Sequence, residues 1–263
     1  MIDYMTSIAP SLDLPPRRQA AIGLALASAE IAAWLAVHVW AVFFYPWERL
    51  GVAPAILVVA VQCWLSVGLF IVAHDCMHGS LVPFRPALNR LIGQVCLALY
   101  ACFNFNALNP KHHLHHRHAG TGSDPDFHDA HPHKFWPWYI KFFGEYFTWG
   151  QLGMLAVVNW GYILGLGAPV QNVLLFWALP AVLSSLQLFT FGTYLPHVPD
   201  DPAFPDRHNA RSNAYPAWLS LLTCFHFGYH HEHHLYPGVP WWRLPAARAT
   251  FRRKSRREDR IGP

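Results

Sequence analysis

The chain has 263 residues, of which 53% are hydrophobic and only 13% are charged. A soluble domain usually carries about 25% charged residues, so much of this surface is expected to face something other than water. The 12 tryptophans agree with that reading, because Trp favours the boundary between lipid and water. The composition therefore excludes an ordinary soluble protein, and a nucleic-acid partner is not expected. Residues 1–263 are predicted to form one domain.

Four segments can cross a bilayer, since a span needs about 20 mostly apolar residues. They are residues 20–45, 52–73, 146–167 and 169–196. A fifth apolar stretch, residues 91–108, is shorter and ends in the polar sequence NFNALNP, so we expect a re-entrant or surface-buried helix there. Residues 215–228 are broken by His226 and are expected at the interface. The predicted fold is an all-α integral membrane protein with four transmembrane helices, re-entrant or interfacial helices and a cytoplasmic-side cap of histidines.

The distribution of basic residues predicts the orientation of the chain in the membrane. With four spans, only Arg49 of the 19 Lys and Arg falls on one side of the membrane. The positive-inside rule then puts both termini and the histidine-rich loops in the cytoplasm, and the protein in the cell inner membrane. The basic run at residues 251–260 reads as a membrane-hugging tail, with a docking site for an acidic electron-transfer protein as the alternative.

The five cysteines form no C-x-x-C pair, which argues against a disulfide framework and against an iron–sulfur or zinc-ribbon site. We expect them to be small apolar fillers of helices. They are Cys63, Cys76, Cys96, Cys102 and Cys224.

Histidines gather in three clusters that follow membrane segments. Residues three and four apart share one face of a helix, so eight imidazoles can converge near one membrane surface. These eight are His74, His78, His112, His115, His116, His230, His233 and His234. Zinc normally takes four ligands at most, so two metals fit this number better than one. Imidazoles suit Fe, Zn, Cu or Ni and do not identify the element.

Several other histidines lie near these clusters. His113, His118 and His231 fall off the shared faces and could orient the ligands or nearby carboxylates. His197, at the end of the fourth predicted span, is a further candidate ligand on the same side. His38 stands alone inside the first span and is expected to be a packing residue.

The three clusters resemble the histidine boxes of the membrane fatty-acid desaturase and hydroxylase superfamily. The matching segments are HDCMHG (74–79), HHLHHRHAGTGSDPDFH (112–128) and HFGYHHEHHLYP (226–237). Box order, box spacing and the intervening spans agree over nearly the whole chain. Within the superfamily, TYLPHVPDDPAFPDRHNARS (193–212) and HHEHHLYPGVPWWRLPAAR (230–248) are similar to the β-carotene 4-ketolase branch.

This resemblance implies a non-haem di-iron centre whose ligands are the eight clustered histidines, with His197 as an extra ligand. It implies O2 and two electrons per turnover from an external carrier. The chain has no fused H-P-G-G haem segment, so a separate ferredoxin-like donor is expected. The branch implies that successive O2-dependent hydroxylations convert the C4 methylene of a β-carotene ring into a ketone, giving echinenone and then canthaxanthin. The carotenoid would arrive laterally from the membrane lipids.

Four polar residues could orient the ligands, or could simply cap helices and form turns: Asp75, Asp124, Asp126 and Asn209. Six aromatic residues flank the boxes and could line a groove for a long polyene, or could simply pack: Phe103, Phe105, Phe191, Tyr194, Phe225 and Tyr229. No catalytic residue beyond the metal ligands is predicted.

Three alternatives stay open. A fatty-acyl desaturase or a carotenoid ring hydroxylase of the same superfamily would have an identical metal site. A membrane metal transporter is more remote, because transporters tend to hold ionisable ligands near the bilayer midplane. Here the histidines cluster beyond the span ends on one side.

Overall fold

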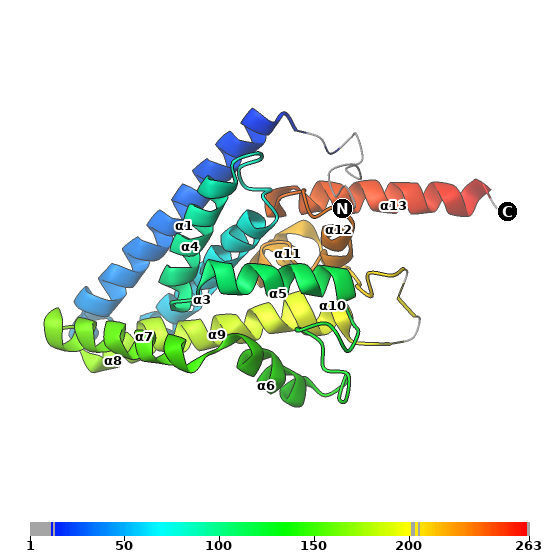
Figure 1. Cartoon of the computed structure of the whole chain (residues 1–263). Helices are drawn as coiled ribbons and strands as arrows, with labels where there is room; N and C mark the ends of the chain where they lie inside the picture. Colours follow the sequence, from blue (N-terminus) through cyan, green and yellow to red (C-terminus); the bar gives the residue numbers. More distant parts are fainter. Residues whose placement is uncertain (1–11, 13, 201–202, 205, 262–263) are drawn as a thin grey trace.

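The computed structural model describes residues 12, 14–200, 203–204 and 206–261, with side chains only up to Arg253 in the last helix. Helices make up the regular structure of this part, in agreement with the predicted all-α class (Figure 1). The expected tail at residues 251–260 is the end of a helix, but its side chains beyond Arg253 lie outside the described residues.

Helix α3 (Val52–Met77) is the central element, and α1, α4 and α9 pack around it. Helix α1 (Pro16–Phe44) begins with proline in its first turn, where the missing N–H costs nothing. It ends at Tyr45, whose extended backbone precedes Pro46, as proline steric restraint requires. The short helix α2 (Trp47–Leu50) then turns the chain into α3.

Helices α4 (Pro86–Ala101) and α5 (Phe105–His118) meet at a bend of 100°. The side chain of Gln94 holds this break together: its Nε2 donates to the Phe103 carbonyl at 3.0 Å and its Oε1 accepts from the Phe105 N–H at 3.0 Å. Gly93 leaves the space that the Phe105 ring fills, since a Cβ there would lie 2.3 Å from the ring. An irregular backbone at membrane depth needs such internal partners.

Helix α5 brings the chain back to the end of α3 from which α4 started. His112 Nε2 on α5 lies 2.6 Å from His78 Nε2, which follows α3 directly. The pair α4–α5 therefore leaves and returns at the same end of the central helix, as expected for a re-entrant segment.

Helix α6 (Phe135–Tyr146) covers the loop after α5, where Trp138 Nε1 donates to the Asp126 carbonyl at 2.6 Å. Helix α7 (Trp149–Trp160) and the π-helical turn η2 (Gly161–Gly165) lead to the opposite end of the molecule. There Asn172 donates to the Val42 carbonyl at 3.1 Å, beside the end of α1.

One long helix, Val170–His197, runs from that far end to the histidine end. It consists of α8 (Val170–Val173), η3 (Leu174–Ala178), α9 (Leu179–Leu188), η4 (Phe189–Tyr194) and α10 (Leu195–His197), with η3 and η4 in π-helical geometry. The C-terminal part comprises α11 (Ala217–Cys224), α12 (His230–Leu235), the 3₁₀ turn η5 (Trp241–Arg243) and α13 (Leu244–Ile261).

Three helices of the described part are long and apolar enough to cross a membrane: Pro16–Phe44, Val52–Met77 and Val170–His197. They correspond to three of the four predicted spans. The fourth, residues 146–167, is not among them, because Tyr146 ends α6 and the helix that follows is short. The bent pair α4–α5 would raise the number to four if it counted as one span.

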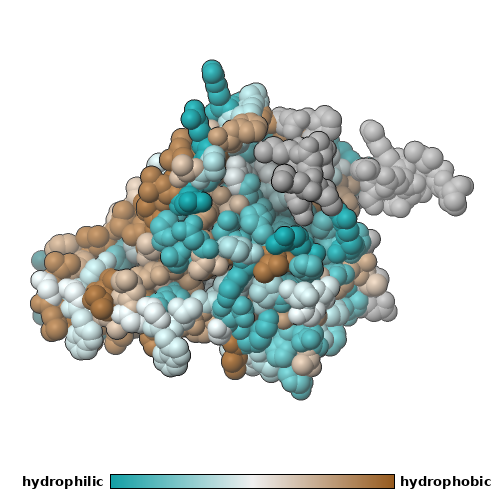
Figure 2. Space-filling model, in the orientation of Figure 1, coloured by the Kyte–Doolittle hydropathy of each residue, from teal (hydrophilic) through white to brown (hydrophobic). Residues whose placement is uncertain are grey.

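The surface has an apolar side and a polar end, as expected for a membrane protein. Figure 2 shows hydrophobic residues over the side formed by α1, α7 and α8 and hydrophilic residues around the histidine end. Large apolar side chains such as Phe44, Val157 and Leu164 are exposed there, at 68%, 69% and 76%. Exposed apolar area on this scale points to contact with lipid or another apolar partner.

Candidate metal centre

The structure brings all nine predicted histidine ligands together, and it sorts them into two groups. Within each group the nearest ring nitrogens all lie within 4.8 Å of one another. The first group, called cluster A, is His74, His78, His112, His116 and His233. The second, called cluster B, is His115, His197, His230 and His234.

Helical geometry produces this division. On α5, His112 and His116 are about one turn apart and belong to cluster A. His115 lies about 100° around the helix axis from His116 and belongs to cluster B. Helix α12 is divided in the same way, with His233 in cluster A and His230 and His234 in cluster B. Helix spacing predicted the convergence, but nothing in the sequence assigned each imidazole to one of two clusters.

The arrangement of ring nitrogens fits metal ions. Pairs of Nε2 atoms face each other at 2.6 Å for His78 and His112, 2.9 Å for His116 and His233, and 3.0 Å for His230 and His234. Both ring nitrogens of His74, and Nε2 of His197, are buried without a partner among the described residues. Lone pairs crowded together in a dry interior are unfavourable unless a shared cation satisfies them.

The protonation state of these rings also suits metal binding. Burial, reinforced by neighbouring imidazoles, lowers the pKa of His230, His233 and His234 well below the usual value. The rings are therefore uncharged at neutral pH, which is the form that binds a metal.

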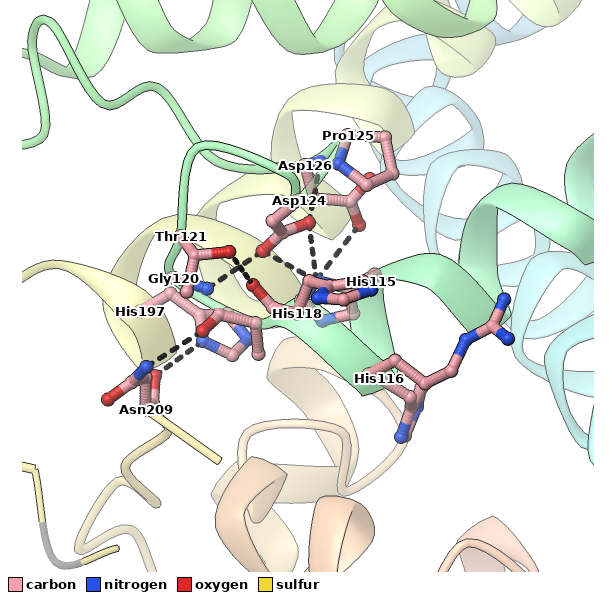
Figure 3. A network of polar contacts seen from close by, with 12 residues as sticks. His115, His116, His118, Gly120, Thr121, Asp124, Pro125, Asp126, His197 and Asn209 are labelled. Atoms are coloured by element: carbon pink, nitrogen blue, oxygen red, sulfur yellow. Dashed lines mark hydrogen bonds and ion pairs between the residues drawn. The ribbon is translucent and has the colours of Figure 1, made fainter. Parts of the chain in front are cut away.

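Hydrogen bonds from Nδ1 fix two of the four rings of cluster B, those of His115 and His197 (Figure 3). His115 Nδ1 donates to the carboxylate of Asp124, at 3.0 and 3.1 Å, which leaves Nε2 for the centre. His197 Nδ1 donates to the backbone carbonyl of Asn209 at 2.7 Å. Ligand histidines typically donate their second nitrogen in this way, which raises the basicity of the ligating one.

The loop after α5 supports Asp124 in turn. The backbone N–H groups of Gly120 and Asp126 donate to its carboxylate at 2.9 and 2.8 Å. Burial opposes ionisation of Asp124, but His115 and these donors outweigh it and hold its pKa below the usual range. Burial raises the pKa of the neighbouring Asp126 to about 6, against the attraction of His115.

His115, Asp124 and Asp126 together also have the spacing of a metal site. Because the Nδ1 proton of His115 is held by Asp124, the Asp124 carboxylate is a support of cluster B. Asp126, also predicted as a residue that could orient a ligand, lies 3.8 Å from His115 Nδ1 and makes no hydrogen bond to it. Asn209 contributes its backbone, while its side chain donates to the Ala119 carbonyl at 2.8 Å.

Asp75 lies beside the candidate ligand His74 but makes no hydrogen bond to it. Its carboxylate is 3.9 Å from His74 Nδ1, beyond hydrogen-bond distance. Instead, Asp75 accepts from the backbone N–H of Trp241 at 3.1 Å and so ties the C-terminal segment to α3.

The three histidines that fall off the shared faces have different surroundings. His231 Nε2 donates to Asp206 at 2.8 Å, and this contact lowers the pKa of Asp206 although burial opposes it. His118 is exposed, and His113 lies beside the ring of His78. His38 is buried far from both clusters and stacks on Trp34, as expected for a packing residue.

An ion pair between Glu232 and Arg248 anchors helix α12, which carries candidate ligands of both clusters. The sequence did not reveal this pair. Glu232 is fully buried between the ligands of α12, and Arg248 Nη1 on α13 donates to its Oε1 at 2.7 Å. The hydroxyl of Ser212 donates to Oε2. An acidic residue inside a histidine box could have been flagged as a buried charge, but nothing in the sequence identified its partner.

A cavity opens beside the two clusters, and both contribute to its wall. His74 and His112 reach it from cluster A, and His115 and His230 from cluster B. Most of the remaining wall is aromatic, with major contributions from Phe70, Tyr100, Phe103, Phe142, Tyr146 and Phe227. Gly192 also lines it, and a Cβ at that position would lie 2.8 Å from the Phe227 ring.

Only Phe103 of the six predicted groove aromatics lines this cavity. The other five pack elsewhere: Phe105 against Gly93, Phe191 beside Tyr215, Tyr194 against Trp138, Phe225 on Trp64 and Tyr229 beside His226. Helix α6 supplies much of the wall instead. Phe142 and Phe143 of α6 lie outside the predicted histidine boxes and the predicted spans, so the sequence did not indicate their place in the wall.

Comparison with known sequences identifies the class. Residues 48–162 and 150–260 match the fatty acid desaturase family, so the chain belongs to that family. It is 52% identical over 239 residues to a β-carotene ketolase from Paracoccus sp., covering 89% of this chain and 96% of the relative.

More distant relatives show the range of the family. A zeaxanthin 4-ketolase from Chlamydomonas reinhardtii is 38% identical over 90% of this chain and 55% of its own length. An sn-1 oleoyl-lipid 12-desaturase from Anabaena variabilis is 24% identical over 81% of this chain and 71% of its own length.

Proposed function

We propose that this protein is a membrane β-carotene ketolase that oxidises C4 of the carotenoid ring to a ketone. The observation that carries the proposal is that both histidine clusters open onto one aromatic cavity, in a chain 52% identical to a β-carotene ketolase. An aromatic-lined cavity suits an apolar polyene, and histidines of both clusters bring the oxidising centre to its wall.

Two iron ions are the proposed cofactors, one in each cluster. Cluster A offers five imidazoles and cluster B four. When bound, the iron pair supplies the activation of O2 that oxidation of a carbon–hydrogen bond requires. Imidazole ligands also accept zinc, so the element rests on the family and not on the ligand set.

The chain's own residues hold and shield this centre. Asp124 and the Asn209 carbonyl fix the rings of His115 and His197, and Glu232 with Arg248 fixes α12. The aromatic wall excludes water from the reacting carbon. Two hydroxylations at C4 then give a geminal diol, which loses water to leave the ketone, and the second ring can follow.

The arrangement of helices supports four membrane crossings. Helices α3 and Val170–His197 both run toward the histidine end, and α1 runs away from it. The chain must therefore cross once more between α5 and α8, through α7 and η2. We infer that α4–α5 is re-entrant, and that the histidine end faces the cytoplasm in the cell inner membrane, where the basic residues gather.

Oxidation by O2 also requires electrons. We infer a separate ferredoxin-like donor that approaches the cytoplasmic side. The substrate would enter from the lipid, because it partitions there.

The test is pigment analysis in a bacterium that accumulates β-carotene. Expression of this chain should yield carotenoids with one and then two ring ketones, and His115→Ala should abolish them. Hydroxylated products alone would assign the protein to a ring hydroxylase. Unchanged carotenoid from folded, iron-loaded protein with a donor present would reject the proposal.

A further inference from the structure

Asp126 and Tyr146 are two of the polar groups in the wall of the cavity, which Ser185 and Thr193 also line. Asp126 and Tyr146 both line it, and the Tyr146 hydroxyl donates to Asp126 Oδ1 in a short hydrogen bond. The Lys111 ammonium lies 5.3 Å from the centre of the Tyr146 ring and donates to Glu145 at 2.7 Å. These contacts hold Tyr146 at the end of α6. Its hydroxyl there fixes the orientation of the Asp126 carboxylate.

The second oxygen of Asp126 accepts no hydrogen bond among the described residues. Oδ2 lies 3.8 Å from His115 Nδ1, whose proton is already held by Asp124 at 3.0 Å. Asp126 lines the largely apolar cavity, where an acceptor without a donor is poorly solvated, so the cavity favours a ligand that brings one. β-Carotene is a hydrocarbon and has no donor to offer. The alcohol formed by its first oxidation carries a hydroxyl donor, and this hydroxyl would lie next to cluster B.

We propose that Asp126, positioned by Tyr146, binds the hydroxyl group of the half-oxidised ring and so retains the alcohol for its second oxidation. This inference rests on the proposed ketolase function and extends it. The ligand class is a carotenoid ring with a hydroxyl on the carbon being oxidised. The two neighbouring carboxylates then have different tasks: Asp124 orients the ligand His115, and Asp126 recognises the intermediate.

The experiment compares pigments made by four proteins in β-carotene-accumulating cells: the unaltered chain, Tyr146→Phe, Asp124→Asn and the control Tyr194→Phe. The quantity measured is the ratio of hydroxyl to ketone ring ends. The control removes one tyrosine hydroxyl outside the cavity, where Tyr194 donates to the His133 carbonyl at 2.9 Å.

Tyr146→Phe should raise this ratio roughly tenfold, the size expected when a hydrogen bond to a charged group is disturbed. Tyr194→Phe should leave the ratio unchanged. Asp124→Asn should reduce both products together, because it acts through a ligand that both oxidations use. An unchanged ratio in Tyr146→Phe, with total oxidised pigment merely reduced, would overturn the inference and leave Tyr146 a structural role.

Membranes supplied with the 4-hydroxy carotenoid give a second readout. Tyr146→Phe should raise the KM for this alcohol by a larger factor than the KM for β-carotene, and equal changes in both would contradict the inference. If the unaltered protein makes no oxidised carotenoid at all, the ketolase proposal itself fails. If it makes ketones and the variants keep its ratio, only the role of Asp126 and Tyr146 fails.

Discussion

Removing Arg248 should weaken the histidine centre without touching a ligand. In Arg248→Ala, the carboxylate of Glu232 would remain fully buried and keep only the Ser212 hydroxyl as partner. Breaking a buried ion pair from one side costs about 3–5 kcal/mol. At about 2–4 °C per kcal/mol for a chain of this size, the midpoint of thermal unfolding should fall by roughly 6–20 °C.

The assay is thermal unfolding of the detergent-purified protein, with bound metal measured on the same samples. The matched control is Arg253→Ala, an exposed arginine on the same helix whose Nε contacts only the Ala249 carbonyl, at 3.2 Å. Adding Glu232→Gln to Arg248→Ala should recover part of the loss, because the uncompensated charge disappears. An unfolding midpoint and metal content equal to those of the Arg253 control would refute the assignment of this pair as the anchor of α12.

Three further outcomes are expected. Gly192→Leu should abolish pigment oxidation but not metal binding, since even a Cβ would lie 2.8 Å from Phe227 in the cavity wall, and pigment and metal analysis of one preparation tests both. Metal-free protein should lose stability as the pH falls below 6.5 in unfolding titrations, because the α12 histidines have lowered pKa values and the unfolded chain takes up more protons there. Asp206→Ala should leave metal content unchanged, because its partner His231 lies in neither cluster.

The sequence predicted the convergence of the candidate ligands because helix periodicity is a local property. Positions three and four apart must share a face, so the convergence of nine imidazoles followed from spacing and from the resemblance. Their division between two clusters depends on how α3, α5 and α12 pack, which is a tertiary property. The same limit applies to Asp75, whose carboxylate lies 3.9 Å from His74 Nδ1 and accepts its hydrogen bond from the Trp241 N–H instead.

The cavity was predicted least well. Aromatic residues near the boxes were chosen by closeness in sequence, but most of the wall comes from elements that fold over the site from elsewhere. Helix α6 is the main case: apart from Tyr146 it lies outside the predicted spans and boxes, and only the tertiary fold brings it against the site. Long uninterrupted spans such as Val52–Met77 were predicted well because apolar length alone defines them.

The most direct test of the account is to count the metal in active protein. Protein purified under conditions that preserve ketone formation should contain two iron ions per chain. His116→Ala and His234→Ala, one from each cluster, should each lower that number and abolish activity. Full ketone formation with one metal ion per chain or fewer, or with both variants active, would contradict a centre built from two histidine clusters.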